Sequence, residues 1–395
     1  MKPDILAVYF PSYHPDAHYE KWYGKGFSEW NLMRGTAPLF EGHHQPLVCE
    51  WGDFDESDPA WMERQIDLAA DHGITGFMFD WYWYNGEKFL DAALERGFLR
   101  ARNRSRLRFC VMWANHTWGV WPAARDLYKG RPTGGKTPDG QALAYDGTLL
   151  PIRHSPEDMD RVTDYCIEHY FREPNYITVD GQPLFCIWYP LELERQLGSP
   201  EAVSAMGERM KARCRKAGLP GLHISINVAN VESDRLCWRP DFIQRYRGPG
   251  VDSAFGYNVS RTKAFATLPN ERPIVPYDDV MASHREIFRW CEDQGMPFHP
   301  VATVGFDNTP RWHRGVKFPI DFRKLGYEPI VTGNTPEKFG ALVKDGLDCI
   351  RRQAPGYHFL LLNAWNEWTE GCYLLPEKRT GNGFLEAVRD AVSPA

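Results

Sequence analysis

The chain has 395 residues, of which 43% are hydrophobic and 25% charged, with a formal net charge of −6 at pH 7. This composition excludes a mainly disordered chain, and the acidic balance without a basic stripe argues against a nucleic-acid-binding protein. Aromatic residues are frequent, at 14%, and aromatic rings offer flat apolar faces on which sugar rings stack well.

Eight short apolar segments are predicted to be buried β-strands, and amphipathic segments between them are predicted to be helices. The strands are expected at residues 5–10, 74–80, 109–113, 184–188, 223–227, 253–257, 301–304 and 359–363. The helices are expected at residues 59–72, 156–171, 200–216, 280–294, 336–352 and 383–392. Four of these helices open with a polar residue followed by proline, which is typical of a helix N-terminus.

Buried strands that alternate with helices predict parallel β/α units, and eight such units fit a closed (β/α)8 barrel (TIM barrel) with long βα loops. An open doubly wound sheet is the alternative, but no G-x-G-x-x-G motif follows the first strand. Because no repeat or linker divides the chain, we expect residues 1–395 to form a single catalytic barrel domain.

Cysteine and histidine usage gives no sign of a metal or a cofactor. The nine cysteines are scattered without a C-x-x-C pair, and the adjacent His43 and His44 lack the spacing of metal ligands. No segment approaches the ~18 apolar residues of a membrane span, and the first strand is too short for a signal sequence.

The expected partner is a carbohydrate, and we expect neither nucleic acid nor a membrane as a partner. The chain is expected to be a monomer or a weak homo-oligomer. The chain as given is expected to be cytoplasmic, or periplasmic or secreted if a leader was removed.

Polar and aromatic residues follow several of the predicted strands, and in a barrel these loops meet on the face that carries the active site. Candidate substrate-binding residues are Tyr9 and His14 after the first strand, Asp80, Tyr82 and Trp83 at the end of the second, Trp113, Asn115, His116 and Trp118 around the end of the third, Asp307, Asn308 and Arg311 after the seventh, and Asn366 and Trp368 after the eighth. The alternatives are structural: Asp80 as an acceptor for backbone amides, the D-N-T-P segment as a turn, and the histidines as packed side chains.

The segment N-A-W-N-E-W-T-E-G at residues 363–371 contains the catalytic candidates Glu367 and Glu370. Two carboxylates three residues apart on a helical turn lie on one face. Glycosidases use such pairs, at ~5–5.5 Å for retention and ~6.5–9.5 Å for inversion. The flanking Trp365 and Trp368 are expected to raise the pKa of one carboxyl group, which makes it an acid. The alternative is that E-x-x-E is common on exposed helices. No Ser-His-Asp order, G-x-S-x-G elbow or phosphate-binding loop occurs, so a hydrolase or transferase acting on sugars fits best.

Several motifs together resemble the WbsX family, also described as the glycoside hydrolase family 99-like domain. They are Y-F-P-S-Y-H-P at 9–15, W-Y-G-K-G-F-S-E-W at 22–30, H-Q-P at 44–46, D-P-A-W from 58 through G-I-T-G-F at 73–77, Y-W-Y-N-G at 82–86, W-A-N at 113–115, V-D-G-Q-P at 179–183, D-N-T-P-R at 307–311 and the 363–371 segment. Trp30, in the second motif, joins the substrate-binding candidates. The resemblance implies a (β/α)8 barrel that uses no metal in its catalytic step.

More distantly, N-E-W-T-E-G is similar to the N-E-W-H-E-G of family 99 endo-α-mannosidases. That similarity implies Glu370 as the acid/base and Glu367 as the base that takes a proton from the sugar 2-hydroxyl. O2 then attacks C1 through an anhydro-sugar intermediate, with net retention. The chain departs from the family at His116, where a carboxylate is usual, and at Asp80, a position that is often aromatic.

The leading hypothesis is a retaining, metal-independent glycoside hydrolase that cleaves a complex poly- or oligosaccharide. The alternative is a glycosyltransferase of polysaccharide assembly that uses an activated sugar donor, a label common in the family. A third possibility is a carbohydrate-binding barrel without catalysis.

Overall fold

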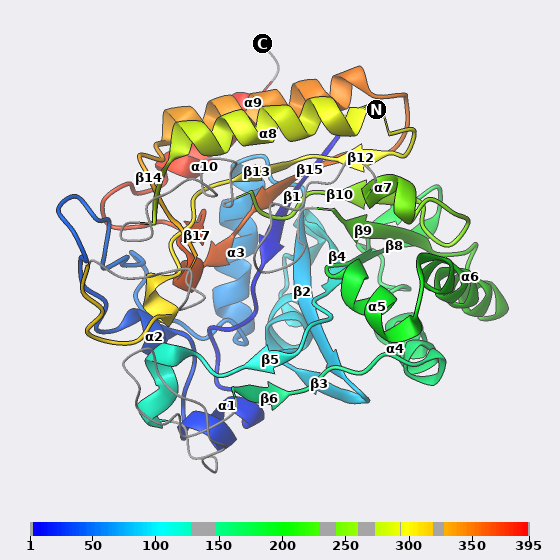
Figure 1. Cartoon of the computed structure of the whole chain (residues 1–395), viewed down its shortest axis with the longest axis horizontal. Helices are drawn as coiled ribbons and strands as arrows, with labels where there is room; N and C mark the ends of the chain where they lie inside the picture. The colour runs from blue at the N-terminus through cyan, green and yellow to red at the C-terminus, as the bar shows by residue number, and fades with distance from the viewer. Residues whose placement is uncertain are drawn as a thin grey trace.

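The computed structural model describes residues 3–127, 147–228, 242–259, 273–292, 294–318 and 328–393. Its centre is a ring of parallel strands surrounded by helices (Figure 1). Around the ring the strands are β1 (Asp4–Tyr9), β2 (Gly76–Tyr84), β4 (Arg108–Trp113), β8 (Gln182–Ile187), β9 (His223–Asn227), β10 (Ser253–Phe255), β12 (Phe298–His299), β13 (Val301–Thr303) and β15 (Phe359–Asn363).

The ring closes through a strand that is interrupted at Pro300. β12 pairs with β10, β13 pairs with β15, and β15 pairs with β1, all in parallel. Proline has no N–H to donate and interrupts the ladder, while the Pro300 carbonyl still accepts from the N–H of Leu361 at 2.9 Å. When β12 and β13 are counted as one strand, the nine segments make eight strands, and the predicted barrel class is confirmed.

The predicted helices are present, three of them with the expected bounds. The helices are α1 (Ala17–Tyr23), α2 (Trp30–Met33), α3 (Pro59–Asp71), α4 (Pro156–His169), α5 (Pro190–Leu197), α6 (Pro200–Lys216), α7 (Phe242–Arg245), α8 (Tyr277–Glu292), α9 (Pro336–Arg352) and α10 (Gly383–Val392). As the sequence predicts, α3, α4, α6 and α9 each start with proline behind a side-chain N-cap. Between β2 and β4 no α-helix forms, and after a short strand the chain makes only the turns η1 (Ala93–Gly97), η2 (Phe98–Arg100) and η3 (Arg104–Arg106).

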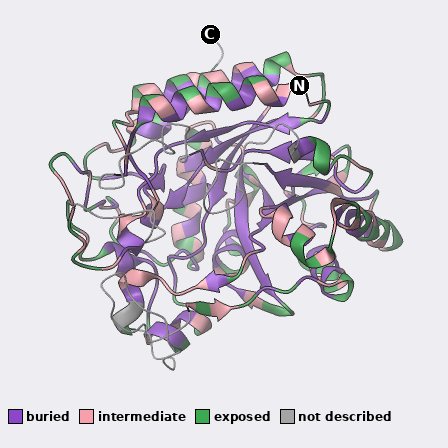
Figure 2. Cartoon of the chain, in the orientation of Figure 1, coloured by how far each residue is buried: buried purple, intermediate pink, exposed green. Residues whose placement is uncertain are grey.

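Short paired strands lie in the loops of the barrel. They are β3 (Glu87–Phe89) beside β2, β7 (Thr178–Val179) beside β8, β5 (Trp118–Gly119) with β6 (Thr148–Leu150), β11 (Ile274–Pro276) with β14 (Ile330–Thr332), and β16 (Asn366–Glu367) with β17 (Cys372–Tyr373). The strands of the ring are buried, whereas the helices expose their outer faces (Figure 2). In the described part of the chain, no helix has both the length and the apolar character that crossing a membrane requires.

Strand β2 is longer than predicted, and its alternating side chains separate two environments. Trp81 and Trp83 face the helix layer, where their indole N–H groups donate to Tyr170 at 3.2 Å and to Asp158 at 3.3 Å. Asp80 and Tyr82 consequently face the opposite side of the strand.

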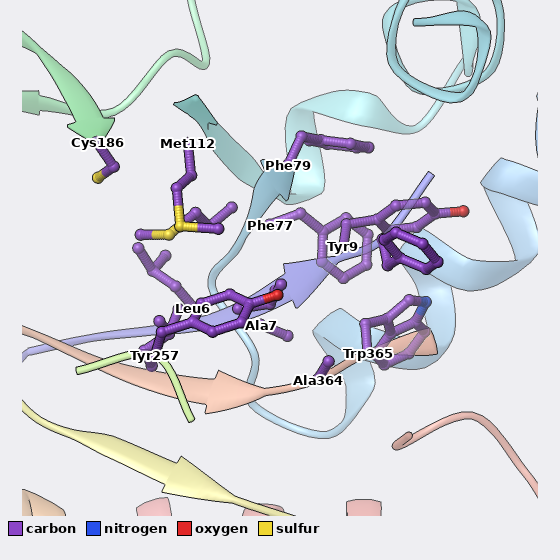
Figure 3. Packing of buried hydrophobic residues seen from close by; sticks show 14 of the residues in the cluster. Leu6, Ala7, Tyr9, Phe77, Phe79, Met112, Cys186, Tyr257, Ala364 and Trp365 are labelled. Carbon is purple, nitrogen blue, oxygen red and sulfur yellow. The ribbon is translucent and has the colours of Figure 1, made fainter. Parts of the chain in front are cut away.

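Aromatic side chains fill the space between the ring and α3. Tyr9 stacks on Phe79 with ring centroids 4.7 Å apart, and Phe77 packs against Trp365 at 5.2 Å (Figure 3). Gly76 lets β2 approach its neighbours, because a Cβ there would lie 2.7 Å from the carbonyl oxygen of Arg108. This rigid packing holds the ends of β1, β2 and β15 in fixed positions.

Candidate active site

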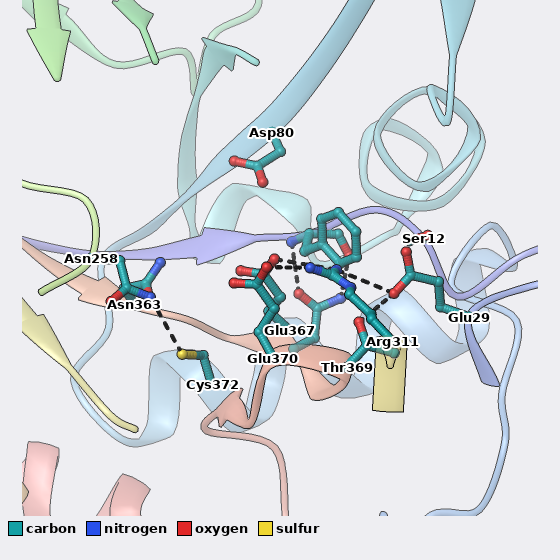
Figure 4. Close-up of polar contacts among 12 residues, drawn as sticks. Ser12, Glu29, Asp80, Asn258, Arg311, Asn363, Glu367, Thr369, Glu370 and Cys372 are labelled. Atoms are coloured by element: carbon teal, nitrogen blue, oxygen red, sulfur yellow. Dashed lines mark hydrogen bonds and ion pairs between the residues drawn. The ribbon is translucent and has the colours of Figure 1, made fainter. Parts of the chain in front are cut away.

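The motif at 363–371 leaves β15 and forms a tight hairpin, with the 3-10 turn η7 (Trp368–Glu370) between β16 and β17. Glu367 precedes the turn and Glu370 ends it, so their carboxyl groups lie side by side (Figure 4). Gly371 follows with φ of 65°, and a Cβ there would lie 2.9 Å from the backbone nitrogen of Asp307. The close approach of the Asp307 loop therefore requires glycine at this position.

Arg311 lies at the centre of the carboxylate cluster. Its guanidinium donates to Glu370, lies 3.3 Å from Glu29, and lies 3.6 Å from Glu367. The same group sits 4.2 Å from the ring centroid of Trp121. Arg311 is almost completely buried, so its charge is held close to these carboxylates in a site shielded from water.

Glu29 was not among the residues predicted for the site. It directly precedes α2, is completely buried, and accepts hydrogen bonds from the hydroxyls of Thr369 and Tyr19. The only sequence signal is an acidic residue between buried aromatic positions in the F-S-E-W segment. Glu29 joins the first βα loop to the turn that carries Glu370.

Asp80 and Tyr257 complete the cluster from the opposite side. Tyr257 follows β10. Its hydroxyl donates to Asp80 at 3.3 Å and lies 3.5 Å from Glu367. The second carboxylate oxygen of Asp80 is buried and has no hydrogen-bond partner. Buried polar atoms are almost always hydrogen-bonded, so this oxygen has an unused capacity to accept a hydrogen bond.

Burial raises the pKa of Glu367 well above its ordinary value of 4.5; Glu370 raises it further, and Arg311 opposes both effects. Burial also raises the pKa of Glu370 and of Asp80. Arg311 also opposes the effect of burial on Glu370, yet the pKa of both carboxyl groups stays raised. Carboxyl groups that stay protonated in a shielded site are suited to acid catalysis.

An aromatic wall, defined here as Tyr82, His116, Trp118 and Trp188, borders the cluster on the side of β2, β4 and β8. Tyr82 and Trp118 are 5.2 Å apart, and His116 lies 5.8 Å from Trp118 and 5.1 Å from Trp188. Trp188, which the sequence did not single out, is partly exposed. Burial lowers the pKa of His116, so this imidazole is neutral near pH 7. Tyr82 and Trp118 are almost completely buried, so the accessible rings of the wall are those of His116 and Trp188, which are of the kind on which sugars stack.

Four predicted site residues are engaged in packing away from the carboxylates. Tyr9 donates to Gln65 of α3 at 3.1 Å, and Trp83 faces α4. His14 is buried against Glu56 at 3.0 Å, and Trp113 packs on His154 at 4.9 Å.

Four other predicted site residues form contacts that stabilise the loops around the site. Asn366 exchanges two hydrogen bonds with the backbone of Phe10, each 2.8 Å. Asn115 exchanges two with the backbone of Tyr189. Trp368 stacks on Tyr373 at 4.3 Å, and Trp30 donates to the Phe54 carbonyl at 2.8 Å.

Asp307 faces away from the cluster and accepts hydrogen bonds from His43 at 2.9 Å and Gln45 at 2.6 Å. Burial opposes ionisation of Asp307, but these donors outweigh it and lower its pKa. Asn308 accepts from the indole of Trp312 at 2.8 Å. Within the described ranges, no three histidine, cysteine or acidic side chains are grouped as metal ligands would be.

A profile of the family described as Glycosyltransferase WbsX matches residues 5–388. Two proteins named "Uncharacterized protein WxcX", from two strains of Xanthomonas campestris pv. campestris, are each 29% identical over 99% of this chain and 50% of their own length. The chain thus spans about half the length of the curated relatives it matches.

Two solved structures share the fold across almost the whole chain. The GH99 endo-alpha-mannosidase from Bacteroides thetaiotaomicron is 13% identical, with a TM-score of 0.54 over 98% of this chain and 96% of that one. A "Glycoside hydrolase-like protein" is 11% identical, with a TM-score of 0.56 over 100% of this chain and 95% of that one. At these identities the likeness is one of architecture.

Proposed function

The chain belongs to the family described as Glycosyltransferase WbsX, as its motifs predicted, and from this premise we propose that it is a glycoside hydrolase. The proposed substrate is a complex poly- or oligosaccharide, and the proposed catalytic unit is the whole chain. The observation that carries the proposal is the carboxyl pair in the hairpin after β15, with Glu367 buried and Glu370 partly exposed, beside Arg311 and opposite the aromatic wall.

In the proposed reaction, Glu370 protonates the leaving glycosidic oxygen, and Glu367 takes the proton of a sugar hydroxyl that attacks the anomeric carbon. The raised pKa values of the two groups support these roles, because a protonated Glu370 is available as the acid and a raised pKa makes an ionised Glu367 a stronger base. The two carboxyl groups lie side by side on one hairpin (Figure 4), and this arrangement supports retention because inversion needs room for a water between the two groups. Asp80 is proposed to bind a sugar hydroxyl through its unpartnered oxygen.

The test is incubation of the protein with a panel of bacterial, algal and plant polysaccharides, followed by analysis of the products. We expect new reducing ends from at least one glycan with wild-type protein, and a large loss with Glu367→Gln. Glu386→Gln, on an exposed position of α10, is the matched control. Equal cleavage by wild type and Glu367→Gln would remove the assignment.

The family description favours a second candidate, a glycosyltransferase that uses an activated sugar donor. A transferase predicts tight binding of a nucleotide sugar, yet the sequence contains no phosphate-binding loop of the G-x-x-x-x-G-K-[ST] type. Titration with nucleotide sugars separates the two, because a hydrolase with this site is expected to bind none of them.

A further inference from the structure

A cavity of about 320 Å³ lies next to the turn that carries Glu370. Its walls come from the loop after β1, from Phe306 and Asp307 after β13, from residues 330–334 at β14, and from the hairpin after β15. These segments follow the carboxyl ends of neighbouring strands, so the cavity opens on the same face of the barrel as the carboxylates. Its volume lies in the range of small-molecule sites.

The cavity and the carboxylate pair share one piece of chain. The N–H of Asp307, in the cavity wall, donates to the carbonyl of Glu370 at 2.6 Å, and Gly371 in the wall directly follows Glu370. The aromatic wall lies on β2, β4 and β8, whereas the cavity lies on β13, β15 and β1. The cavity therefore lies on the side of the carboxylates away from the aromatic wall.

Arg379 brings an uncompensated positive charge to this cavity. Its side chain is exposed, and its guanidinium reaches only the carbonyl of Gln45, at 3.4 Å. Among the described residues no carboxylate is close enough to pair with it. Asp307 already accepts from His43 and Gln45, and the buried Glu377 accepts from the N–H groups of Val48 and Arg379.

His44 also lines the cavity, but its ring is engaged. Its Nε2 lies 3.5 Å from the carboxylate of Glu377, within ion-pair distance. His44 therefore holds Glu377, which leaves Arg379 as the group that can bind an anion. Phe306 and Tyr373 supply an apolar surface beside these polar groups.

We propose that this cavity is a subsite for a sugar unit that carries a carboxylate, such as a uronic acid. The carboxylate binds Arg379, whose planar guanidinium suits a two-point contact, and the sugar ring packs on Phe306 and Tyr373. The inference rests on the proposed function in one respect: the acidic unit belongs to the glycan that the carboxylate pair cleaves. It deepens that function by assigning the substrate to the acidic glycans.

The test compares binding of methyl β-D-glucuronide and methyl β-D-glucoside by calorimetric titration and ligand-observed NMR. We expect the glucuronide to bind at least tenfold more tightly than the glucoside, and Arg379→Ala to remove this preference. Arg389→Ala, on an exposed position of α10, is the matched control and should change nothing. Equal affinity for both probes, or a preference that survives Arg379→Ala, would overturn the subsite.

Binding and cleavage are measured separately, so the two proposals can fail independently. A protein that binds glucuronide through Arg379 but cleaves no glycan supports the subsite and removes the hydrolase assignment. A protein that cleaves a neutral glycan and ignores glucuronide keeps the hydrolase assignment and removes the subsite.

Discussion

The guanidinium of Arg311 donates a hydrogen bond to the carboxylate of Glu370, and this contact joins the loop after β13 to the turn after β15. Glu29 holds the other side of the same guanidinium, at 3.3 Å. The proposed acid is thus fixed from two loops that lie far apart in the sequence. The contact also lowers the pKa of Glu370 against the effect of burial, so Arg311 controls both position and charge.

The roles of the two glutamates can be separated with substrates of different leaving groups. Glu370→Gln should slow cleavage of the natural glycan by about 10²–10⁴-fold, the usual contribution of general acid catalysis. It should retain most of the initial bond cleavage in an aryl glycoside whose phenolate leaves without a proton. Glu367→Gln should impair both substrates. Rates of phenol release and reducing-end formation measure this, and the opposite pattern would exchange the roles.

Replacement of Arg311 by methionine should move the pH–rate profile toward higher pH. Arg311 lowers the pKa of both Glu367 and Glu370, so its loss raises both values and shifts both limbs of the profile. Breaking a buried ion pair also costs about 3–5 kcal/mol of stability. Arg311→Lys keeps the charge and should shift the profile less. The profile and chemical denaturation are the measurements, and an unshifted profile in Arg311→Met would contradict this role.

Glu367→Gln should stabilise the fold at neutral pH. The pKa of Glu367 is raised in the folded state, so above the ordinary value of 4.5 the unfolded chain loses this proton while the folded chain keeps it. The unfolded state then binds fewer protons, and wild-type stability falls as pH rises from that value toward the folded-state pKa. Glutamine has no such proton. Thermal unfolding should show a gap in favour of Glu367→Gln that widens with pH, whereas a constant gap would argue against the raised pKa.

Trp188→Ala tests the aromatic wall. Loss of one stacked ring costs about 0.5–1.5 kcal/mol of binding, so KM for the glycan should rise roughly threefold to tenfold with little change in kcat. Trp290→Ala, a partly buried tryptophan on the outer helix α8, is the matched control for the effect on folding. A change confined to kcat would place Trp188 outside the sugar-binding surface.

Glu56→Ala should destabilise the barrel, because Glu56 accepts hydrogen bonds from the backbone of Tyr13 at 2.7 Å and from Asn366 at 3.1 Å. Each stranded buried donor costs about 1–3 kcal/mol. Glu56→Gln keeps one acceptor oxygen and should lose less. Denaturant titration measures both variants, and equal stability of wild type and Glu56→Ala would show that these bonds contribute nothing net.

The sequence predicted the barrel well because its signals are local. Apolar runs of strand length and proline behind an N-cap mark the elements without knowledge of their neighbours. The interruption at Pro300 was not predicted, because the run at 301–304 already accounted for the seventh strand. The extension of β2 to Tyr84 was also missed, although its aromatic residues favour strands.

The site was less accessible to sequence reasoning because its polar contacts join distant loops. Glu29 and Tyr257 have no distinctive spacing, and only the closed ring brings them to Glu367 and Arg311. The alternation of side chains along a strand would have distinguished Trp83 from two other candidates. Asp80 and Tyr82 share one face of β2, so Trp83 must lie on the other face.

The pairing of β15 with β1 on one side and β13 on the other also has a consequence for synthesis of the protein. Until residues 359–363 leave the ribosome, β1 and the interrupted strand each present an unpaired edge, and exposed edges invite association with other chains. The hairpin with both catalytic candidates follows directly after β15. A ribosome-bound chain truncated before β15 should therefore be both inactive and prone to aggregate. Closure of the barrel and assembly of the site thus occur together, late in synthesis.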